Sequence, residues 1–432
     1  MQTSRDILKN ISGGKSVALF GRGVSTIAAQ SLFKTAGVNC VFYGDKDGEN
    51  FGEAEAKNHA LAVYSPAFSP RHPFRILAEK CGVKAVGEPD LAGMIWRGKT
   101  IAVSGTNGKT TLTSFLTAAL NKAGKKAFAC GNIGRPLCAF LADGVSADET
   151  AVFEISSFQS TSLKSLNFDA FLWTNFAPDH LDWHADMREY FDAKLNILNF
   201  LKSETFIYGS GVKEFAQKFS RRLPDFAVFA DKNSAFESPK PFDNSIQREN
   251  FLIAKLFWKS LNLDEKILLD SAKDFSLARY RFAKISGLNG ITFWNDSKAT
   301  NAHAAIAALK ELKGKKVFWI GGGKNKYCDN SELCKTVGEV ACGAALIGQT
   351  AGELKNALKG LPLGVYVCEN LKQAIELAVQ KCPSKADILF SPAFSSFGMF
   401  KSYSDRGKCF DEAVSEILSE KNIKIQLNKA AF

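Results

Sequence analysis

A short glycine-rich segment between an apolar run and a helical pattern constrains this chain more than any other feature. The segment spans residues 104–111 and follows the apolar residues 100–103. A turn at such a place presents backbone N–H groups and the positive end of a helix dipole to an anion. Lys109 adds a mobile positive charge for terminal phosphates, and the Thr110 hydroxyl suits Mg²⁺. The segment predicts a nucleoside triphosphate site, although Val103 stands where the full phosphate-loop pattern begins with glycine; an ordinary strand–turn–helix with a surface lysine is the alternative.

Length, composition and cysteine usage limit the class of protein. A chain of 432 residues is expected to form roughly two to four domains. Its first residues lead into a mixed helix, and no uncharged apolar stretch approaches the ~20 residues that span a bilayer. The ten cysteines are scattered and form no Cys-x-x-Cys pair, which indicates a reducing compartment and argues against structural zinc. We therefore expect a cytoplasmic protein without membrane insertion.

The formal net charge of +11 would suit a nucleic-acid-binding protein. However, the lysines and arginines are spread along the chain and form no basic block. An enzyme that handles several anionic substrates has the same bias. We therefore expect no nucleic-acid partner.

Residues 1–92 predict a small α/β unit with a glycine turn. A strand at 15–20 is followed by Gly21–Gly23 and a helix, and Asp45 comes after the next strand. Glycines after a strand, with an acid about twenty residues on, resemble a dinucleotide fingerprint. Thr26 stands where the last glycine of that fingerprint is expected. From the residues alone NAD, another nucleotide-like ligand near Asp45, and a plain packing turn all remain open.

Two further α/β blocks are expected, at residues 93–277 and 278–432. Apolar strands alternate with helical patterns in both blocks, and several strands are apolar on both faces, as in a buried parallel sheet. Residues 201–243 are expected to be irregular beyond a strand at 204–208. The predicted fold class is α/β, with three consecutive domains: a Rossmann-like N-terminal domain, a central phosphate-loop ATPase domain and a Rossmann-like C-terminal domain.

Polar residues follow several of the expected strands. Glu154 ends one strand, and His180 follows the next one along the chain. The carboxyl ends of parallel strands meet at one edge, so both residues are expected to border one pocket with the glycine-rich segment. Carboxylate, imidazole and threonine hydroxyl suit Mg²⁺ that phosphate oxygens already hold. Zinc between His180 and His184 is the disfavoured alternative, because no cysteine or third histidine accompanies them.

A run of small, polar or charged residues, 295–301, directly follows the expected strand 291–294. Such a run is poor packing material and suits ligand binding; a polar turn with a helix cap at Thr300 or Asn301 is the alternative. The loops 321–326 and 391–397 end two further strands at the same edge. Together these segments predict a cationic, hydroxyl-lined pocket for a small anion.

These motifs together resemble the Mur ligase family, the ATP-dependent amide ligases of peptidoglycan synthesis, over the whole chain. Residues 105–110 are shared with folylpolyglutamate synthases. Residues 295–301, 131–134, 154–159 and 391–393 are similar to the branch that adds D-glutamate to UDP-N-acetylmuramoyl-L-alanine. The resemblance implies a monomeric cytoplasmic ligase that uses ATP and Mg²⁺ and forms an acyl phosphate. It also implies that the first domain binds UDP rather than NAD.

The resemblance implies roles by position. The implied ATP contacts are Gly105, Thr106, Asn107, Gly108, Lys109, Thr110, Thr111, Asn132, Asn250, Arg281 and Asp296. The implied metal ligands are Thr110, Glu154, His180 and, if it is carbamylated, Lys194. The implied UDP contacts are Val24, Ser25 and Asp45. The implied D-glutamate contacts are Lys298, Thr300, Lys326 (or Lys324), Ser396, Phe397 and Tyr403. The implied catalytic residues are Lys109, His180, Lys194 and Lys298.

Two alternatives to this function are weaker. A folylpolyglutamate synthase shares the glycine-rich segment but lacks a UDP-binding first domain of this kind. A non-catalytic ATP-binding regulator would leave Glu154, His180 and Lys194 without a role. We therefore expect an enzyme.

Overall fold

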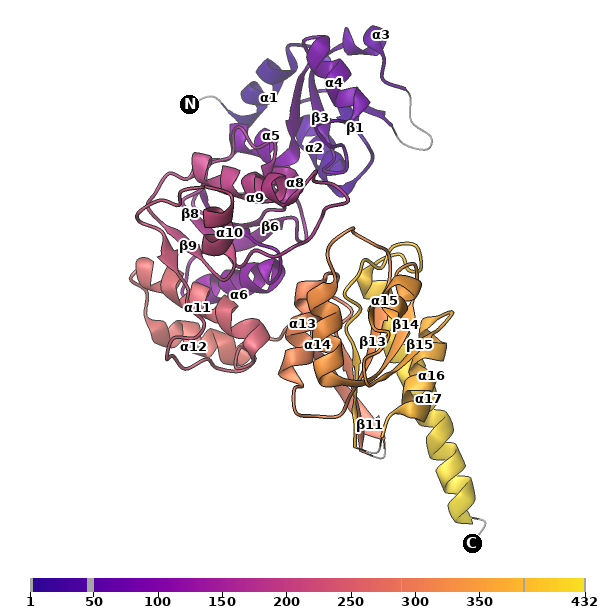
Figure 1. Cartoon of the computed structure of the whole chain (residues 1–432). Helices are drawn as coiled ribbons and strands as arrows, with labels where there is room; N and C mark the ends of the chain where they lie inside the picture. Colours follow the sequence, from indigo (N-terminus) through magenta and orange to yellow (C-terminus); the bar gives the residue numbers. More distant parts are fainter. Residues whose placement is uncertain (1–2, 45–49, 289, 384, 431–432) are drawn as a thin grey trace. The chain divides into compact units, whose positions relative to one another are not determined.

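The computed structural model describes residues 3–44, 50–288, 290–383 and 385–430, which form helices and three sheets (Figure 1). The expected mixed α/β class with mostly parallel sheets is confirmed. By their contacts the residues divide into two compact units. Unit 1 comprises Met1–Phe176, Trp183–Asp243 and Gln247–Phe275, and unit 2 comprises Ala177–Asp182, Asn244–Ile246 and Ser276–Phe432. Each of the three expected ranges contains one sheet, and the first two sheets share unit 1.

The first sheet, in unit 1, has the strand order β2-β1-β3-β4, and all its pairings are parallel. Its elements are α1 (Ser4–Ser12), β1 (Ser16–Phe20), α2 (Val24–Thr35), β2 (Cys40–Tyr43), α3 (Glu53–Ala56), β3 (His59–Tyr64), α4 (Pro73–Lys80), β4 (Lys84–Gly87) and α5 (Glu88–Ile95).

The second sheet, also in unit 1, has the order β10-β9-β8-β5-β7-β6 and is parallel throughout. Its strands are β5 (Lys99–Ser104), β6 (Ala127–Gly131), β7 (Thr150–Glu154), β8 (Ala170–Trp173), β9 (Phe206–Tyr208) and β10 (Val228–Phe229). Its helices are α6 (Lys109–Lys122), α7 (Leu137–Ala142), α8 (Ser157–Ser160), α9 (Met187–Leu195), the 3₁₀ helix η1 (Asn196–Phe200), α10 (Val212–Lys218), α11 (Ser245–Ser260) and α12 (Glu265–Asp274).

The third sheet, in unit 2, has the order β11-β12-β16-β13-β14-β15. Its strands are β11 (Ala283–Leu288), β12 (Ile291–Asn295), β13 (Val317–Gly322), β14 (Ala341–Ile347), β15 (Gly364–Val367) and β16 (Asp387–Phe390). Its helices are α13 (Ala302–Glu311), α14 (Ser331–Val340), α15 (Ala351–Ala357), α16 (Leu371–Lys381) and α17 (Tyr403–Ala430). Among the described residues, no helix combines the length and apolar character needed to cross a membrane.

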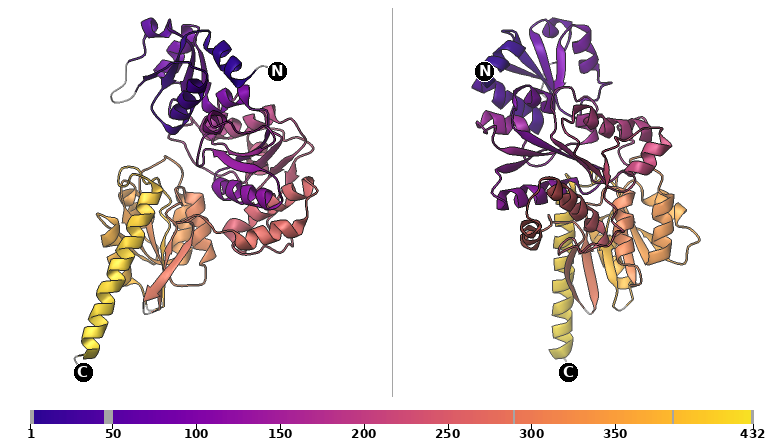
Figure 2. Two further views of the ribbon diagram at one scale, coloured as in Figure 1. Left: turned by 180° about the vertical axis from the view of Figure 1, so that it is seen from behind. Right: turned by 90° about the vertical axis from the view of Figure 1, so that its left-hand side faces the viewer.

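Successive side chains of a strand enter two different cores, as the two-residue period of a strand requires. In β13, Val317 and Trp319 pack in one core with α13, α14 and α15, whereas Phe318 and Ile320 pack in another with α16 and α17. Figure 2 shows α17 running along this second face of the sheet. Burial on both faces explains why these strands read as nearly continuous apolar runs.

One core in unit 1 belongs to both of its sheets. Leu19 and Val63 of the first sheet and Phe153 and Trp173 of the second are members of a single connected apolar cluster. Helix α7, from the second block, contacts α2 and α5, from the first. This shared core is the reason that the two sheets form one compact unit.

One expectation about the elements is wrong, and one strand was not expected. Residues 201–243, expected to be irregular beyond one strand, also contain the helix α10 and the short strand β10. The unexpected strand is β11, which pairs antiparallel with β12 at the edge of the third sheet. A strand that returns directly as a hairpin needs no crossover helix, so the alternating strand–helix pattern gave no sign of it.

Two acidic residues in the first turn of α5 are buried where α5 meets the second block. Glu88 Oε1 accepts a hydrogen bond from Cys138 N (2.7 Å), and Asp90 Oδ1 accepts bonds from Lys164 N and Ser165 N (both 2.7 Å). Glu88 Oε2 is buried and has no partner among the described residues. Burial raises the pKa of Glu88 to about 7, although the bonds from Cys138 favour the charged form.

Replacing Glu88 by glutamine is expected to stabilise the protein more at about pH 8 than at about pH 5. The folded protein holds the Glu88 proton up to about pH 7, whereas the unfolded chain releases it near pH 4.5. The free energy of unfolding therefore falls as the pH rises through this window, by about 3 kcal/mol in total. Glutamine does not titrate, so Glu88→Gln removes this loss. Urea unfolding of both proteins at the two pH values measures it, and an equal difference at both would contradict the assignment.

Candidate functional site

The glycine-rich segment lies between β5 and α6, as predicted, and the neighbouring strand β8 braces it. Thr174 Oγ1, just beyond β8, lies 2.5 Å from Asn107 O and 3.2 Å from Ser104 O. Asn175 Oδ1 accepts a hydrogen bond from Asn107 N (2.9 Å), and Asn175 O accepts one from Thr106 N (3.0 Å). Thr174 and Asn175 were not expected from the sequence to take part in the site. Their position in the sequence could have indicated a role, because they directly follow β8, the strand that pairs with β5.

Two glycines of the segment adopt backbone conformations that favour glycine. Gly105 has φ +143° and Gly108, the residue before α6, has φ +86°. A Cβ atom at Gly105 would collide with Thr174, and one at Gly108 would collide with the Asn250 amide. Asn250, an expected ATP contact on α11, is buried beside the segment and donates to Gln247 Oε1 (2.9 Å).

Two lysine ammonium groups lie at one carbonyl oxygen of the segment. Gly105 O accepts hydrogen bonds from Lys109 Nζ (2.9 Å) and Lys194 Nζ (2.8 Å). Lys194, on α9, is only 1% exposed, and its ammonium also lies 4.9 Å from the ring centre of Tyr190. The Tyr190 hydroxyl lies 3.1 Å from Thr106 Oγ1. Without the resemblance Lys194 would be taken for a solvated helix charge, and the structure instead buries it beside the segment.

Glu154, at the end of β7, has one oxygen available for a ligand. Its Oε1 accepts a hydrogen bond from Asn132 Nδ2 (3.0 Å), whereas its Oε2 is buried without a partner among the described residues. A buried, unpartnered carboxylate oxygen is the kind of donor that Mg²⁺ prefers. The described part of the chain contains no cluster of three His, Cys, Asp or Glu side chains that could hold a metal by themselves. Glu154 therefore fits a magnesium ion that phosphate oxygens share.

The glycine turn of the first sheet is held by the side chain of Thr26. Thr26, which replaces the expected glycine, is buried and its hydroxyl donates to Gly21 O (2.6 Å) and accepts from Gly23 N (3.1 Å). Val24, an expected UDP contact at the start of α2, is 67% exposed, and Ser25 is half-buried. The third expected UDP contact, Asp45, lies outside the described residues.

In unit 2, Asp296 follows β12 and is buried in a hydrogen-bonded network. Its Oδ1 accepts a bond from Phe282 N (3.0 Å), and its Oδ2 accepts one from Ser391 Oγ (2.8 Å). Burial raises the pKa of Asp296 to about 7, against the hydrogen bonds and the nearby Arg281 and Arg406 guanidinium groups. The residues on either side of Arg281 have positive φ, +65° at Tyr280 and +49° at Phe282. Strained backbone of this kind is concentrated at functional sites.

Arg406 was not expected from the sequence. It is 1% exposed on α17 and donates to Ser297 O (2.8 Å), Ser297 Oγ (3.1 Å) and Phe394 O (3.0 Å). Burial lowers the pKa of Arg406 to about 9. The residue joins two of the loops that the sequence analysis singled out. No sequence pattern marks it, because an arginine in a helix is usually solvated.

The polar run 295–301 proves to be partly structural. Asn295 Nδ2 donates to Gly407 O and Asp411 Oδ1, and the Asn301 side chain caps α13 by accepting from Ala304 N (3.0 Å). The cap at Asn301 was the alternative prediction, and it is confirmed.

The residues expected around D-glutamate lie on the loops of unit 2. The Lys298 ammonium lies 3.7 Å from the ring centre of Tyr403. Ser396 is buried, Phe397 is 60% exposed and Thr300 is half-buried. Lys298 and Tyr403 are thus in direct contact, whereas their role toward D-glutamate stays a prediction.

His180 belongs to unit 2, whereas Glu154 and Lys109 belong to unit 1. The neighbouring Asp179 accepts hydrogen bonds from Lys326 Nζ (2.7 Å) and Asn301 Nδ2 (2.8 Å). Lys326 is therefore paired with a buried carboxylate, while Lys324 is exposed.

His184 is a buried core histidine. Its Nε2 lies 2.9 Å from Ser157 Oγ, and burial lowers its pKa to about 4. It does not lie on a helix with His180, since helix α9 begins only at Met187. The zinc alternative needs His180 and His184, four residues apart, on one face of a helix, and the described segment between them is not helical.

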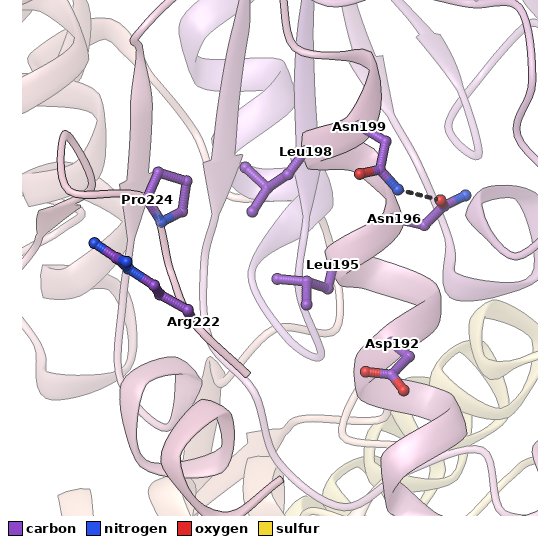
Figure 3. A pocket seen from close by; sticks show the side chains of 7 residues that line it. All are labelled: Asp192, Leu195, Asn196, Leu198, Asn199, Arg222 and Pro224. Atoms are coloured by element: carbon purple, nitrogen blue, oxygen red, sulfur yellow. Dashed lines mark hydrogen bonds between the residues drawn. The ribbon is translucent and has the colours of Figure 1, made fainter. Parts of the chain in front are cut away.

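A hollow of about 410 Å³ lies elsewhere in unit 1, at the end of α9 (Figure 3). Its lining residues are Asp192, Leu195, Asn196, Leu198, Asn199, Arg222 and Pro224. Asn199 Nδ2 donates to Asn196 Oδ1 (2.9 Å) at its rim. None of the expected site residues lines this hollow.

Thr174→Val is expected to weaken ATP binding by about tenfold, because it removes the hydroxyl that braces the Asn107 carbonyl. The matched control is Thr117→Val on α6, whose hydroxyl bonds the Thr113 carbonyl of its own helix and no other described group. Titration of both variants with ATP by calorimetry measures the effect. Equal ATP affinities in the two variants would show that the brace does not shape the loop for nucleotide.

Comparison with known proteins gives the family. A Mur ligase middle domain matches residues 103–269, and a Mur ligase glutamate ligase domain matches residues 280–394. The UDP-N-acetylmuramoylalanine–D-glutamate ligase of Aquifex aeolicus is 31% identical over 414 residues, which are 92% of this chain and 97% of the relative. The enzyme of the same name from Caldanaerobacter subterraneus is 30% identical and covers 93% of this chain and 98% of the relative.

Solved structures share the fold at low identity. The UDP-N-acetylmuramate–alanine ligase of Thermotoga maritima has a TM-score of 0.59 and 16% identity, over 93% of this chain and 99% of that one. The Mycobacterium tuberculosis folylpolyglutamate synthase complexed with ADP has a TM-score of 0.56 and 14% identity, over 75% of this chain and 92% of that one. On the strength of the sequence matches, the chain belongs to the Mur ligase family and, within it, to the UDP-N-acetylmuramoylalanine–D-glutamate ligases.

Proposed function

We propose that this chain is a cytoplasmic, ATP-dependent ligase that adds D-glutamate to UDP-N-acetylmuramoyl-L-alanine during the synthesis of peptidoglycan precursors. The observation that carries the proposal is the end-to-end match to relatives of that name, which covers 97% and 98% of their length. The two buried or half-buried lysines at Gly105 O support it, because they concentrate positive charge where the family binds phosphate.

The three sheets support three domains, at residues 1–92, 93–277 and 278–432, each of which binds a different part of the substrates. In the first, Val24, Ser25 and Asp45 contact the UDP moiety. In the second, the glycine-rich segment with Asn132 and Asn250 binds ATP, and in the third Arg281 and Asp296 contribute to the nucleotide. The proposed D-glutamate contacts are Lys298, Thr300, Lys326, Ser396, Phe397 and Tyr403.

The proposed reaction has two steps. The substrate carboxylate attacks the γ-phosphorus of ATP, which gives an acyl phosphate and ADP. The amine of D-glutamate then attacks the acyl carbon, the carbon–oxygen bond to phosphate breaks, and an amide and inorganic phosphate result. Both partners of the first step are anionic, so catalysis depends on positive charge and positioning, which Lys109 and Lys298 supply.

Mg²⁺ would supply further charge neutralisation at the phosphates, and Thr110, Glu154 and His180 are the residues proposed to hold it. The unpartnered Glu154 Oε2 supports this role. Lys194 is proposed to act as a carbamate, which converts its buried cation into an anion able to bind metal.

The proposal is tested by phosphate release from ATP with Mg²⁺ and UDP-N-acetylmuramoyl-L-alanine, with D-glutamate, L-glutamate or D-alanine added in turn. Release with amide product is expected only with D-glutamate. Lys109→Ala is expected to lower kcat by at least about a hundredfold, because the γ-phosphate loses its nearest mobile cation. The matched control Lys125→Ala, at an exposed lysine beyond the same helix, is expected to keep full activity. Absence of product with all three amino acids, or full activity of Lys109→Ala, would refute the proposal.

Lys194→Ala is expected to lose activity that a short carboxylic acid or concentrated bicarbonate partly restores. The deletion leaves space where the Lys194 side chain stood, and a small carboxylate bound in that space replaces the carbamate. Phosphate release measured against increasing acetate checks this, with Lys125→Ala as the variant that acetate should not change. A loss that no acid restores would count against the carbamate and in favour of the buried ammonium itself.

A further inference from the structure

We propose that Asp179 is a positioning residue that couples binding of the amino-acid carboxylate at Lys326 to the placement of the His180 imidazole. The inference rests on the proposed function, since it takes Lys326 and His180 as binding and reacting groups of that ligase. It assigns to Asp179 a role that none of the expected site residues has.

The contacts of Asp179 occupy both of its oxygens. Oδ1 accepts hydrogen bonds from Lys326 Nζ (2.7 Å) and from His180 N (2.8 Å). Oδ2 accepts a bond from Asn301 Nδ2 (2.8 Å) and lies 3.7 Å from His180 Nε2. The Asp179 side chain is only 4% exposed. One buried carboxylate therefore touches the ammonium, the imidazole and a helix cap.

Asp179 and Lys326 form a buried ion pair, since their side chains are only 4% and 13% exposed. Removing one member of such a buried pair leaves the other charge without compensation. Lys326 and Asp179 therefore depend on each other for their positions.

Asp179 also fixes the segment that carries His180. The segment Ala177–Asp182 belongs to unit 2, although the residues on both sides of it belong to unit 1. Asn301, which holds Asp179 Oδ2, is the N-cap of α13, so the segment is attached to a rigid helix start. His180 itself has φ +60°, a strained conformation for a residue with a side chain, which the bond from its N–H to Asp179 helps to hold.

The ion pair with Asp179 restrains the position of the Lys326 ammonium. A lysine ammonium has three N–H donors, and the bond to Asp179 uses one of them. The Lys326 side chain is 13% exposed, so the ammonium can donate a second hydrogen bond to a ligand carboxylate while Asp179 restrains its flexible stem. A carboxylate bound there competes with Asp179 for the same ammonium, and Asp179 Oδ1 also holds the His180 N–H, so a shift of Asp179 moves the segment that carries the imidazole. This is the route by which the amino acid acts on the imidazole.

The test compares Asp179→Asn with Asp387→Asn. Asp387 lies at the opposite end of the third sheet, at the first residue of β16, where it accepts a bond from Trp294 Nε1 (2.6 Å). In Asp179→Asn the charge is lost and an amide donor faces the Asn301 donor. We expect the KM for D-glutamate to rise and kcat to fall, each by about tenfold or more, with the KM for ATP changed less than about twofold. Asp387→Asn is expected to match the wild type in all three constants.

A double-mutant cycle separates positioning from general destabilisation. Lys326→Met and Asp179→Asn are combined, and the effect on kcat/KM for D-glutamate is compared with the two single effects. We expect the double variant to be no more than about twofold worse than the worse single variant, since both remove one interaction. Effects that simply multiply would overturn the coupling.

Hydrogen exchange of the peptide spanning residues 177–183 gives a readout that needs no ligase activity. We expect exchange in Asp179→Asn to be faster than in the wild type by about tenfold or more, and exchange in Asp387→Asn to be unchanged. Unchanged exchange in Asp179→Asn would overturn the anchoring role. A different outcome separates the two proposals. If the wild type forms no amide with D-glutamate while Asp179→Asn still exchanges faster, the proposed function and the coupling to an amino acid are refuted. The anchoring role of Asp179 then remains.

Discussion

Strands that are buried on both faces impose the arrangement on which the rest of this structure depends. In β13 alternate side chains enter two separate cores, so helices must cover both faces of the sheet. Parallel neighbours require a crossover for each connection, and the carboxyl ends of the strands consequently meet at one edge. For this reason Glu154 stands at the end of β7, and the loops that leave β5, β12 and β16 carry the glycine-rich segment, Asp296 and Ser396. The candidate site residues are thus placed by the sheets and not by the loops themselves.

Several charged side chains at these edges are buried, and specific hydrogen-bond partners hold each of them in place. Lys194 bonds Gly105 O, Asp179 bonds Lys326 and Asn301, and Arg406 bonds three acceptors on two loops. Burial of an ion without such partners is costly, so these contacts specify one arrangement of the loops. Glu88, at the junction of the two sheets of unit 1, is the contrasting case, since burial raises its pKa and one of its oxygens lacks a partner among the described residues.

Much of the fold and part of the candidate site could be predicted because their signals are local. Strand–helix alternation gave the mixed α/β class, and the glycines at 105 and 108 marked a turn that φ values of +143° and +86° confirm. The edge strand β11, the helix α10 and the burial of Arg406 could not be predicted in this way. Their positions follow from pairing and packing with residues far along the chain, for which a single sequence contains no periodic signal.

The sequence by itself determined which residue types stand after each strand, and therefore the phosphate-binding character of the segment that contains Lys109. Only the tertiary structure decided which of these residues share a partner. Lys194 and Lys109 converge on Gly105 O although 85 residues separate them (194 − 109), and Asp179 joins unit 2 although its neighbours in the chain belong to unit 1. The physical reason is that a hydrogen bond depends on distance in space, which strand order and helix packing set, whereas the spacing of residues along the chain determines only local structure.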